Sequence, residues 1–133
     1  MPEASRPGAR VLLTSMAAKV RIYHNPKCSK SRETLALLRE RGVEPEIVEY
    51  LKQPPTAAEV EDLIGKLKLE PHALLRTKEE PYKKLKLTPK STQAQVAKAI
   101  ASEPVLLERP IVVVGKRAAI GRPPENVLEI LPK

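Results

Sequence analysis

A strand-like run, a helix-like run and a second strand-like run follow one another closely near the start of the chain, and this succession constrains the fold most. The segment 19–25, KVRIYHN, alternates apolar and polar side chains and is rich in β-branched residues. From about residue 29, leucines and alanines recur on one helical stripe that stops at Gly42. The segment 45–51, PEIVEYL, is again strand-like. This order predicts a βαβ unit, in which the two strands are parallel.

The middle of the chain is instead typical of helices. Thr56 and Glu59 have the spacing of a capping box, and they precede a run with helical periodicity. Two further helical stretches are predicted over 71–85, broken at Pro81, and over 91–104. We therefore expect a helical segment to separate two halves of the sheet.

The last third returns to strands. PIVVVG, 110–115, is a buried type of strand, and RAAIG, 117–121, pairs back across a Gly115-Lys116 turn as an antiparallel hairpin. The segment 123–131 is predicted to be helical. The chain is thus expected to be an α/β protein with a mixed four-stranded sheet and a helical insert between the second and third strands.

The first 18 residues differ in character from the rest. They combine Pro, Gly, Arg and Ser around a short apolar patch, with no amphipathic period and no convincing signal segment. We expect residues 1–18 to be a disordered leader or an artefact of the assigned start, with Met16 as the initiator. Residues 19–133 then form a single domain, since one hydrophobic core commonly serves about 100–200 residues.

The composition indicates the cellular compartment of the protein and the classes of partner that it can bind. A single cysteine cannot form an internal disulfide, and no apolar run approaches the roughly 18 residues of a membrane helix, so we expect a cytoplasmic protein without a membrane partner. The net charge of +8 favours an anionic partner. Basic residues alternate with acidic ones and there is no Phe or Trp, which argues against nucleic-acid binding. The two histidines and the cysteine lack metal-ligand spacing, so no metal site is predicted.

The single cysteine, Cys28, lies in the turn between the first strand and the first helix. A thiolate there would meet the free N–H groups of the helix's first turn, which lower a thiol pKa. Lys27 and Lys30 add positive potential, Ser31 offers a hydroxyl, and a charged His24 would lower the thiol pKa further. A lone intracellular cysteine is often only a small buried hydrophobe, but these polar neighbours favour a reactive thiol.

Three arginines border apolar segments and stand apart from the other charges. They are Arg76 in ALLRT, Arg109 before Pro110, and Arg122 in IGRPP. Each alone is typical of a surface charge or an ion-pair partner. Together they could converge on one site, because guanidinium groups bind tetrahedral oxyanions through paired hydrogen bonds.

Five blocks of the sequence resemble the glutaredoxin-coupled arsenate reductase family, and the likeness suggests its short chromosomal branch. The blocks are IYHNPKCSKSRETLALLRERG, EYLKQPPT, ALLRTKEEPYKKL, ERPIVVV and IGRPPENVLEIL, in the family's order from about Lys19 onward. The resemblance implies a thioredoxin/glutaredoxin-like fold that carries a helical insert. It also implies a cis peptide bond between Arg109 and Pro110.

The resemblance assigns a role to each candidate residue. It implies that Cys28 is the catalytic nucleophile, that Arg76, Arg109 and Arg122 bind the substrate oxyanion, and that His24 and Ser31 stabilise the thiolate. The implied substrate is arsenate, which the Cys28 thiolate attacks. The implied co-substrate is glutathione and the implied protein partner is glutaredoxin, with no bound cofactor and a monomeric protein.

One departure from the better-studied members of this family leaves other functions open. The chain ends two residues after EIL, as in the short branch, so arsenate as the physiological substrate stays open. One alternative is a glutathione-dependent thiol reductase that removes glutathione from other proteins with the same Cys28. The other is an Spx-like regulator that binds RNA polymerase, although such regulators typically carry C-x-x-C where this chain has Ser31.

Overall fold

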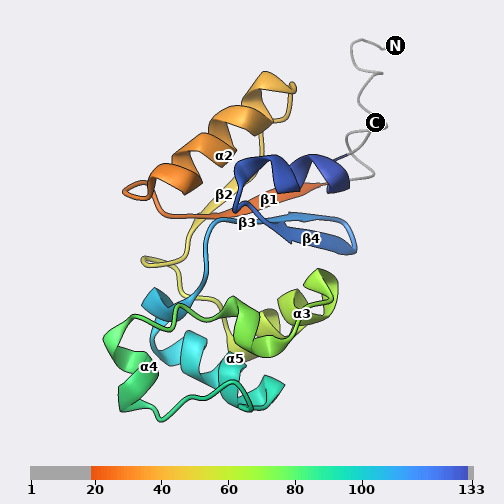
Figure 1. The fold of residues 1–133 in the computed structure, drawn as a ribbon. Helices are drawn as coiled ribbons and strands as arrows, with labels where there is room; N and C mark the ends of the chain where they lie inside the picture. Colours follow the sequence, from red (N-terminus) through yellow and green to blue (C-terminus); the bar gives the residue numbers. More distant parts are fainter. Residues whose placement is uncertain (1–18, 132–133) are drawn as a thin grey trace.

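The computed structural model describes residues 19–131, so the predictions for 1–18, 132 and 133 lie outside the described residues. A four-stranded sheet has the order β2-β1-β3-β4 (Figure 1). Strand β1 runs parallel to β2 and antiparallel to β3, and β3 pairs antiparallel with β4. The predicted mixed α/β sheet is confirmed. The strands are β1 (Val20–His24), β2 (Glu46–Glu49), β3 (Ile111–Val114) and β4 (Arg117–Ile120).

Helices cover both faces of the sheet (Figure 1). One face carries α2 (Ser29–Glu40) and the 3-10 helix η3 (Pro124–Ile130). The predicted helical insert between β2 and β3 is present, and it lies on the other side of the sheet. It contains α3, α4 and α5, with short 3-10 helices η1 and η2 before α4 and after α5. In chain order these elements are α3 (Ala57–Leu67), η1 (Pro71–Leu74), α4 (Glu80–Lys84), α5 (Gln93–Ser102) and η2 (Pro104–Leu106).

Alternate residues of the central strands feed two separate cores. Ile22 of β1 and Val112 of β3 are fully buried against Leu38 of α2. Their neighbours Tyr23 and Ile111 point to the opposite face and pack with the helices of the insert. The alternation follows from the strand period of two, and it gives each helical layer its own hydrophobic cluster.

Side-chain caps begin the two long helices of the insert. Thr56 and Glu59 form the predicted capping box, with bonds of 3.1 Å from the Glu59 N–H to Thr56 Oγ1 and 2.9 Å from the Thr56 N–H to Glu59 Oε1. A second capping box, between Thr92 and Gln95, starts α5. Each box satisfies two N–H groups that the helix cannot satisfy itself.

The segment 71–85 differs from the single broken helix predicted for it. It forms η1, an extended stretch at Leu75, and then α4, in which Pro81 lies in the first turn. Proline starts a helix readily because the N–H that it lacks has no intrahelical partner at that position. The prediction that Pro81 breaks a helix was therefore wrong. The segment 123–131 is helical as predicted, but of the 3-10 type.

The extended stretch at Leu75 joins the insert to the chain that leads into β3. Leu75 and Leu107 form an isolated antiparallel bridge. Beside it the Arg76 N–H donates to Leu106 O at 2.8 Å, and the Glu108 N–H donates to Leu74 O at 2.7 Å. This pairing places Arg76 beside Leu106, and Leu74 beside Glu108, although these residues are far apart in sequence.

In the part of the chain that the structure describes, no helix is long and apolar enough to cross a membrane.

We predict that Leu38→Ala lowers the free energy of unfolding by about 2–5 kcal/mol, because Leu38 is fully buried between α2 and the sheet and its truncation leaves a cavity. Urea denaturation followed by circular dichroism measures this. Leu69→Ala, at a leucine that is 46% exposed, is the matched control and should change stability by less than about 1 kcal/mol. Equal losses in the two variants would contradict the assignment of this core.

Candidate functional site

Cys28 lies in the turn between β1 and α2. It is the N-cap residue of α2, with extended backbone angles (φ −97°, ψ 123°), and only 7% of its surface is exposed. Its N–H donates to Asn25 O at 2.9 Å, and its carbonyl accepts from the Arg32 N–H at 3.0 Å. The turn therefore directs the thiol toward the first N–H groups of α2, at the edge where the parallel strands β1 and β2 end.

The surroundings of the thiol favour the thiolate. Burial raises the pKa of Cys28, but hydrogen bonding to the backbone N–H groups of Ser31 and Lys30 and the charges of Arg109 and Arg122 outweigh it. The result is a pKa below the ordinary thiol value. This is the activated thiol predicted from the sequence, with the helix N–H groups and two arginines as its causes.

Two of the three predicted arginines meet at Cys28. Arg122 Nη2 donates to Cys28 Sγ at 3.6 Å, and Arg122 Nε donates to Arg109 O at 2.7 Å. The Nε and Nη1 atoms of Arg109 are buried and have no hydrogen-bond partner among the described residues. Buried donors are nearly always paired in folded proteins, so these two are suited to receive an oxyanion.

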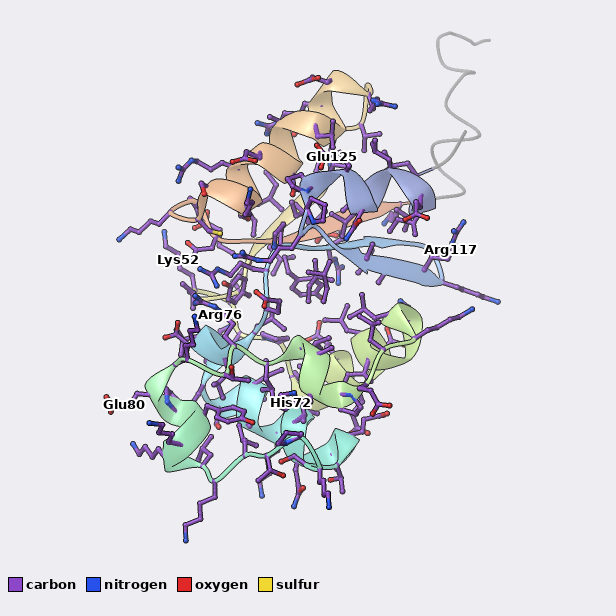
Figure 2. All side chains as sticks on the ribbon, viewed as in Figure 1. Lys52, His72, Arg76, Glu80, Arg117 and Glu125 are labelled. Carbon is purple, nitrogen blue, oxygen red and sulfur yellow. The ribbon has the colours of Figure 1, made fainter. Side chains whose placement is uncertain are left out.

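The third arginine lies at the margin of the site, between the sheet and the insert (Figure 2). Arg76 Nη1 pairs with Glu79 Oε2 at 2.7 Å. Its charge acts on the Tyr50 hydroxyl, as that of Arg109 does, but it is not among the groups that shift the pKa of Cys28. Arg76 therefore acts on Tyr50, which lies near the thiol, and not on the thiol itself.

His24 and Ser31 form a buried pair behind the thiol. Ser31 Oγ is 2.6 Å from His24 Nδ1 and also accepts the Asn25 N–H at 3.0 Å. Burial lowers the pKa of His24, opposed by Glu49 and reinforced by Arg39 and Arg32. The imidazole is therefore neutral at neutral pH and does not supply the positive charge that a charged His24 would have added.

His24 and Ser31 act on the site through hydrogen bonds and not through the charge of the His24 ring. The Ser31 hydroxyl is engaged with His24 and Asn25, so it is the backbone N–H of Ser31 that lowers the thiol pKa. The tautomer of the neutral His24 ring sets which of Ser31 Oγ and Nδ1 donates in this bond. The pair fixes the turn on which Cys28 lies rather than adding a charge to it.

Sequence reasoning missed three residues of the site. Tyr50 follows β2 and is 1% exposed; burial raises the pKa of its hydroxyl, against the charges of Arg109 and Arg76, so it stays protonated. Glu108 pairs with Arg122 Nε at 3.2 Å, and Glu79 holds Arg76 as above. The alternation in 45–51 indicated that Tyr50 is buried but not what it faces, and no local pattern marks the two glutamates.

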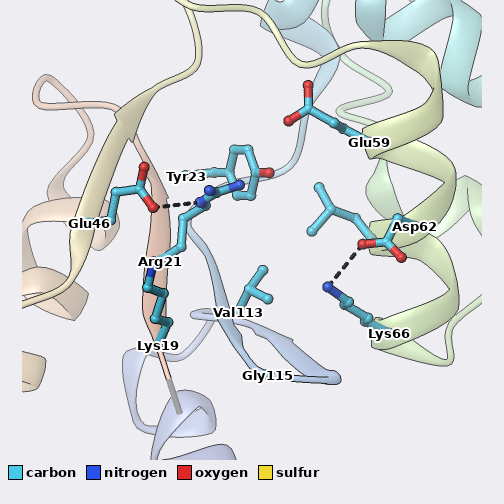
Figure 3. Close-up of a pocket in the computed structure, with 10 residues that line it drawn as sticks. Lys19, Arg21, Tyr23, Glu46, Glu59, Asp62, Lys66, Val113 and Gly115 are labelled. Atoms are coloured by element: carbon cyan, nitrogen blue, oxygen red, sulfur yellow. Dashed lines mark hydrogen bonds and ion pairs between the residues drawn. The ribbon is translucent and has the colours of Figure 1, made fainter. Parts of the chain in front are cut away.

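A separate cavity of about 240 Å³ lies at the opposite end of β1, between the sheet and α3 (Figure 3). Three cations and three carboxylates line it, and four of them form ion pairs, Arg21 with Glu46 at 3.1 Å and Lys66 with Asp62 at 2.9 Å. A cavity whose cations and carboxylates neutralise one another has no preference for an oxyanion. Within residues 19–131, no group of three His, Cys, Asp or Glu side chains could hold a metal ion.

Comparison with known proteins matches almost all of the described chain. The ArsC family model matches residues 23–130. The uncharacterized protein YfgD of Escherichia coli strain K12 is 52% identical over 118 residues, covering 87% of this chain and 99% of that protein. An arsenate reductase of Haemophilus influenzae is 50% identical over 112 residues, covering 83% and 97%.

A solved structure gives the same result for the fold. The arsenate reductase from Vibrio cholerae superposes with a TM-score of 0.81 at 50% sequence identity, over 85% of this chain and 98% of that one. The sheet, the covering helices and the insert are therefore those of these relatives.

We predict that the alkylation rate of Cys28 rises with a midpoint below about 8.5, the usual value for a free thiol, because helix N–H groups and two arginines favour the thiolate. The pH dependence of iodoacetamide labelling of the folded protein measures it. The same chain unfolded in urea supplies the control and should titrate near the usual value. Equal midpoints in the two states would show that the fold does not activate the thiol.

We also predict that stability falls as the pH drops through about 6.5, the unfolded pKa of histidine. The folded pKa of His24 is depressed, so just below 6.5 the unfolded chain binds a proton that the folded chain does not. Stability is fully present above this window and is lost as the pH falls toward the folded pKa. Urea denaturation on both sides of the window should show a smaller loss for His24→Asn than for the unaltered protein; equal losses would argue against a buried, neutral His24.

Proposed function

The chain belongs to the ArsC family, and we propose that it reduces arsenate to arsenite with Cys28 as its nucleophile and with glutathione and glutaredoxin as the source of electrons. The relatives named arsenate reductase support the substrate. One observation carries the proposal for this chain: a nearly buried thiol with a lowered pKa lies beside a guanidinium whose buried donors have no partner within residues 19–131.

In the first step, the Cys28 thiolate attacks arsenic. A sulfur–arsenic bond forms, an arsenic–oxygen bond breaks, and the departing oxygen leaves as water once it has taken up a proton. Arsenic stays in the +5 state. The Nε and Nη1 donors of Arg109 bind the arsenate oxygens, and donors fixed in place stabilise the charge that develops there without reorganising.

The second step supplies two electrons. A glutathione thiol attacks the adduct, a disulfide forms between Cys28 and glutathione, and the electron pair of the broken sulfur–arsenic bond reduces arsenic to the +3 state. Arsenite leaves. Glutaredoxin then removes glutathione from Cys28 by thiol–disulfide exchange, which regenerates the thiolate. Two thiols are oxidised for each arsenate reduced, so the electrons balance.

The need for an outside thiol follows from the cysteine count. The chain contains one cysteine, so it has no second thiol with which to release the adduct or to resolve a disulfide. The reductant must come from another molecule. This favours the glutathione route over a relay of cysteines within the chain.

The remaining site residues have supporting roles in the proposal. Arg122 holds the thiolate through Nη2 and adds positive charge for the oxyanion. Arg76 would reach the oxyanion if it exchanged its partner Glu79 for the substrate. Ser31 favours the thiolate through its N–H group, and His24 keeps that turn in place.

We predict arsenate-dependent NADPH consumption by the purified protein when glutathione, glutaredoxin and glutathione reductase are present. Cys28→Ser should abolish it, because the hydroxyl of serine is not ionised at neutral pH. Arg109→Ala should lower kcat/KM for arsenate at least about tenfold, roughly 1.4 kcal/mol of transition-state stabilisation.

Arg117→Ala is the matched control, since the Arg117 side chain, on the β3–β4 hairpin, is exposed and within residues 19–131 donates only to Glu129 O of η3. It should leave kcat/KM unchanged. Absence of arsenate turnover, with a Cys28 that still titrates as an activated thiol, would refute the arsenate proposal. In that case reduction of glutathionylated proteins would be the function to measure next.

A further inference from the structure

Glu108 is a carboxylate that contacts two residues of the site without reaching the thiol. Its Oε1 atom accepts the Arg109 N–H at 3.1 Å and pairs with Arg122 Nε at 3.2 Å. Its own N–H donates to Leu74 O at 2.7 Å, which anchors its main chain to the insert. One oxygen atom therefore ties the backbone of one arginine to the side chain of another.

Arg122 depends on these contacts for its position. Its Nε faces both Glu108 Oε1 and Arg109 O, while its Nη2 donates to Cys28 Sγ. The guanidinium thus spans the distance between Glu108 and the thiol. A free arginine side chain samples many rotamers, and holding it in one costs conformational entropy, so its anchors decide whether it stays at the thiol.

We propose that Glu108 is a positioning residue of the thiol site, whose carboxylate oxygen holds Arg122 against Cys28 and against the Arg109 main chain. This rests on the proposed function only in taking Cys28 as the reactive group. What Glu108 supplies is a fixed carboxylate that forms an ion pair with Arg122 Nε, whose single hydrogen is donated to Arg109 O, and that accepts the Arg109 N–H.

Two effects of this carboxylate on the thiol have opposite signs. As a negative charge it would disfavour the thiolate and raise the thiol pKa; as the anchor of Arg122 it favours the thiolate and lowers the pKa. The groups that act on Cys28 are the N–H groups of α2 and the charges of Arg109 and Arg122, and Glu108 is not among them. Tyr50, whose hydroxyl lies near Cys28, is uncharged at neutral pH. Glu108 contacts Arg122 and the Arg109 main chain, and it has no contact with Cys28 among the described residues, so we expect the anchoring effect to be the larger one.

The opposite signs make Glu108→Ala and Glu108→Gln a decisive pair. In Glu108→Ala, Arg122 loses an anchor, so the alkylation midpoint of Cys28 should rise by about half a unit or more, a fraction of the roughly 1–3 units that a nearby opposite charge produces. Glu108→Gln keeps the oxygen that accepts the Arg109 N–H but loses the ion pair with Arg122, so its midpoint should also rise, by less than in Glu108→Ala. If both variants lower the midpoint, Glu108 acts only as a charge and the proposal fails. If neither moves it, the proposal fails as well.

Controls separate positioning from loss of fold. Asp62→Ala and Asp62→Asn remove a carboxylate that pairs with Lys66 on α3, at the opposite end of β1 from the thiol, and should not shift the midpoint. Thermal unfolding of each variant checks that it is folded. In an Arg122→Ala background, Glu108→Ala should produce no further rise, because its effect passes through Arg122; a further rise of the same size would overturn the proposal.

The readout is independent of arsenate. The titration needs only the full-length protein and iodoacetamide, so a failure of arsenate turnover leaves this test intact. Conversely, a Glu108→Ala variant with an unchanged midpoint would overturn this inference while leaving the proposed reaction untouched.

Discussion

The short antiparallel pairing of Leu75 with Leu107 is the contact on which the geometry of the site depends. Two flanking hydrogen bonds, from Arg76 N–H to Leu106 O and from Glu108 N–H to Leu74 O, extend it. The pairing joins a helical insert, which shares no strand with the sheet, to the segment that enters β3. Arg76 of the insert and Arg109 at the entry to β3 both act on the Tyr50 hydroxyl, which lies near the thiol. Without the pairing, the insert would be only a cover over one face of the sheet.

Charge in the site is balanced for two of the three arginines. Arg76 is paired with Glu79, and Arg122 with Glu108. Arg109 has no carboxylate partner among the described residues, and two of its donors are buried. A buried cation is costly unless an opposite charge lies close by. The thiolate supplies part of that charge, and an oxyanion bound to the guanidinium would supply the rest. The same cation thus serves both the nucleophile and the substrate in the proposed reaction.

Local sequence patterns were sufficient for the elements that position the thiol, but not for the partners that surround it. The strand at 19–25, the helix from residue 29 and the turn at Cys28 follow from periodicity and from glycine and proline positions, which act over a few residues. The mixed sheet and the insert also followed from the order of the elements. The extended Leu75 did not, since its partner Leu107 lies 32 residues further along the chain. The neutral state of His24 and the contact between Glu108 and Arg122 depend on burial and on distant residues, which no local pattern contains.

Because the sheet has a separate core on each face, a bound ligand would affect how the protein unfolds locally. Cys28 belongs to the helix of one layer, whereas Arg76 belongs to the insert that forms the other, and Arg109 and Arg122 lie at the edge between them. An oxyanion held by these residues would act as a cross-link between two layers that otherwise share only the sheet. Separation of the layers by local unfolding would then require release of the ligand, so occupancy would merge two independently opening units into one. A bound substrate would therefore make the unfolding of the two layers more cooperative, in addition to undergoing the reaction.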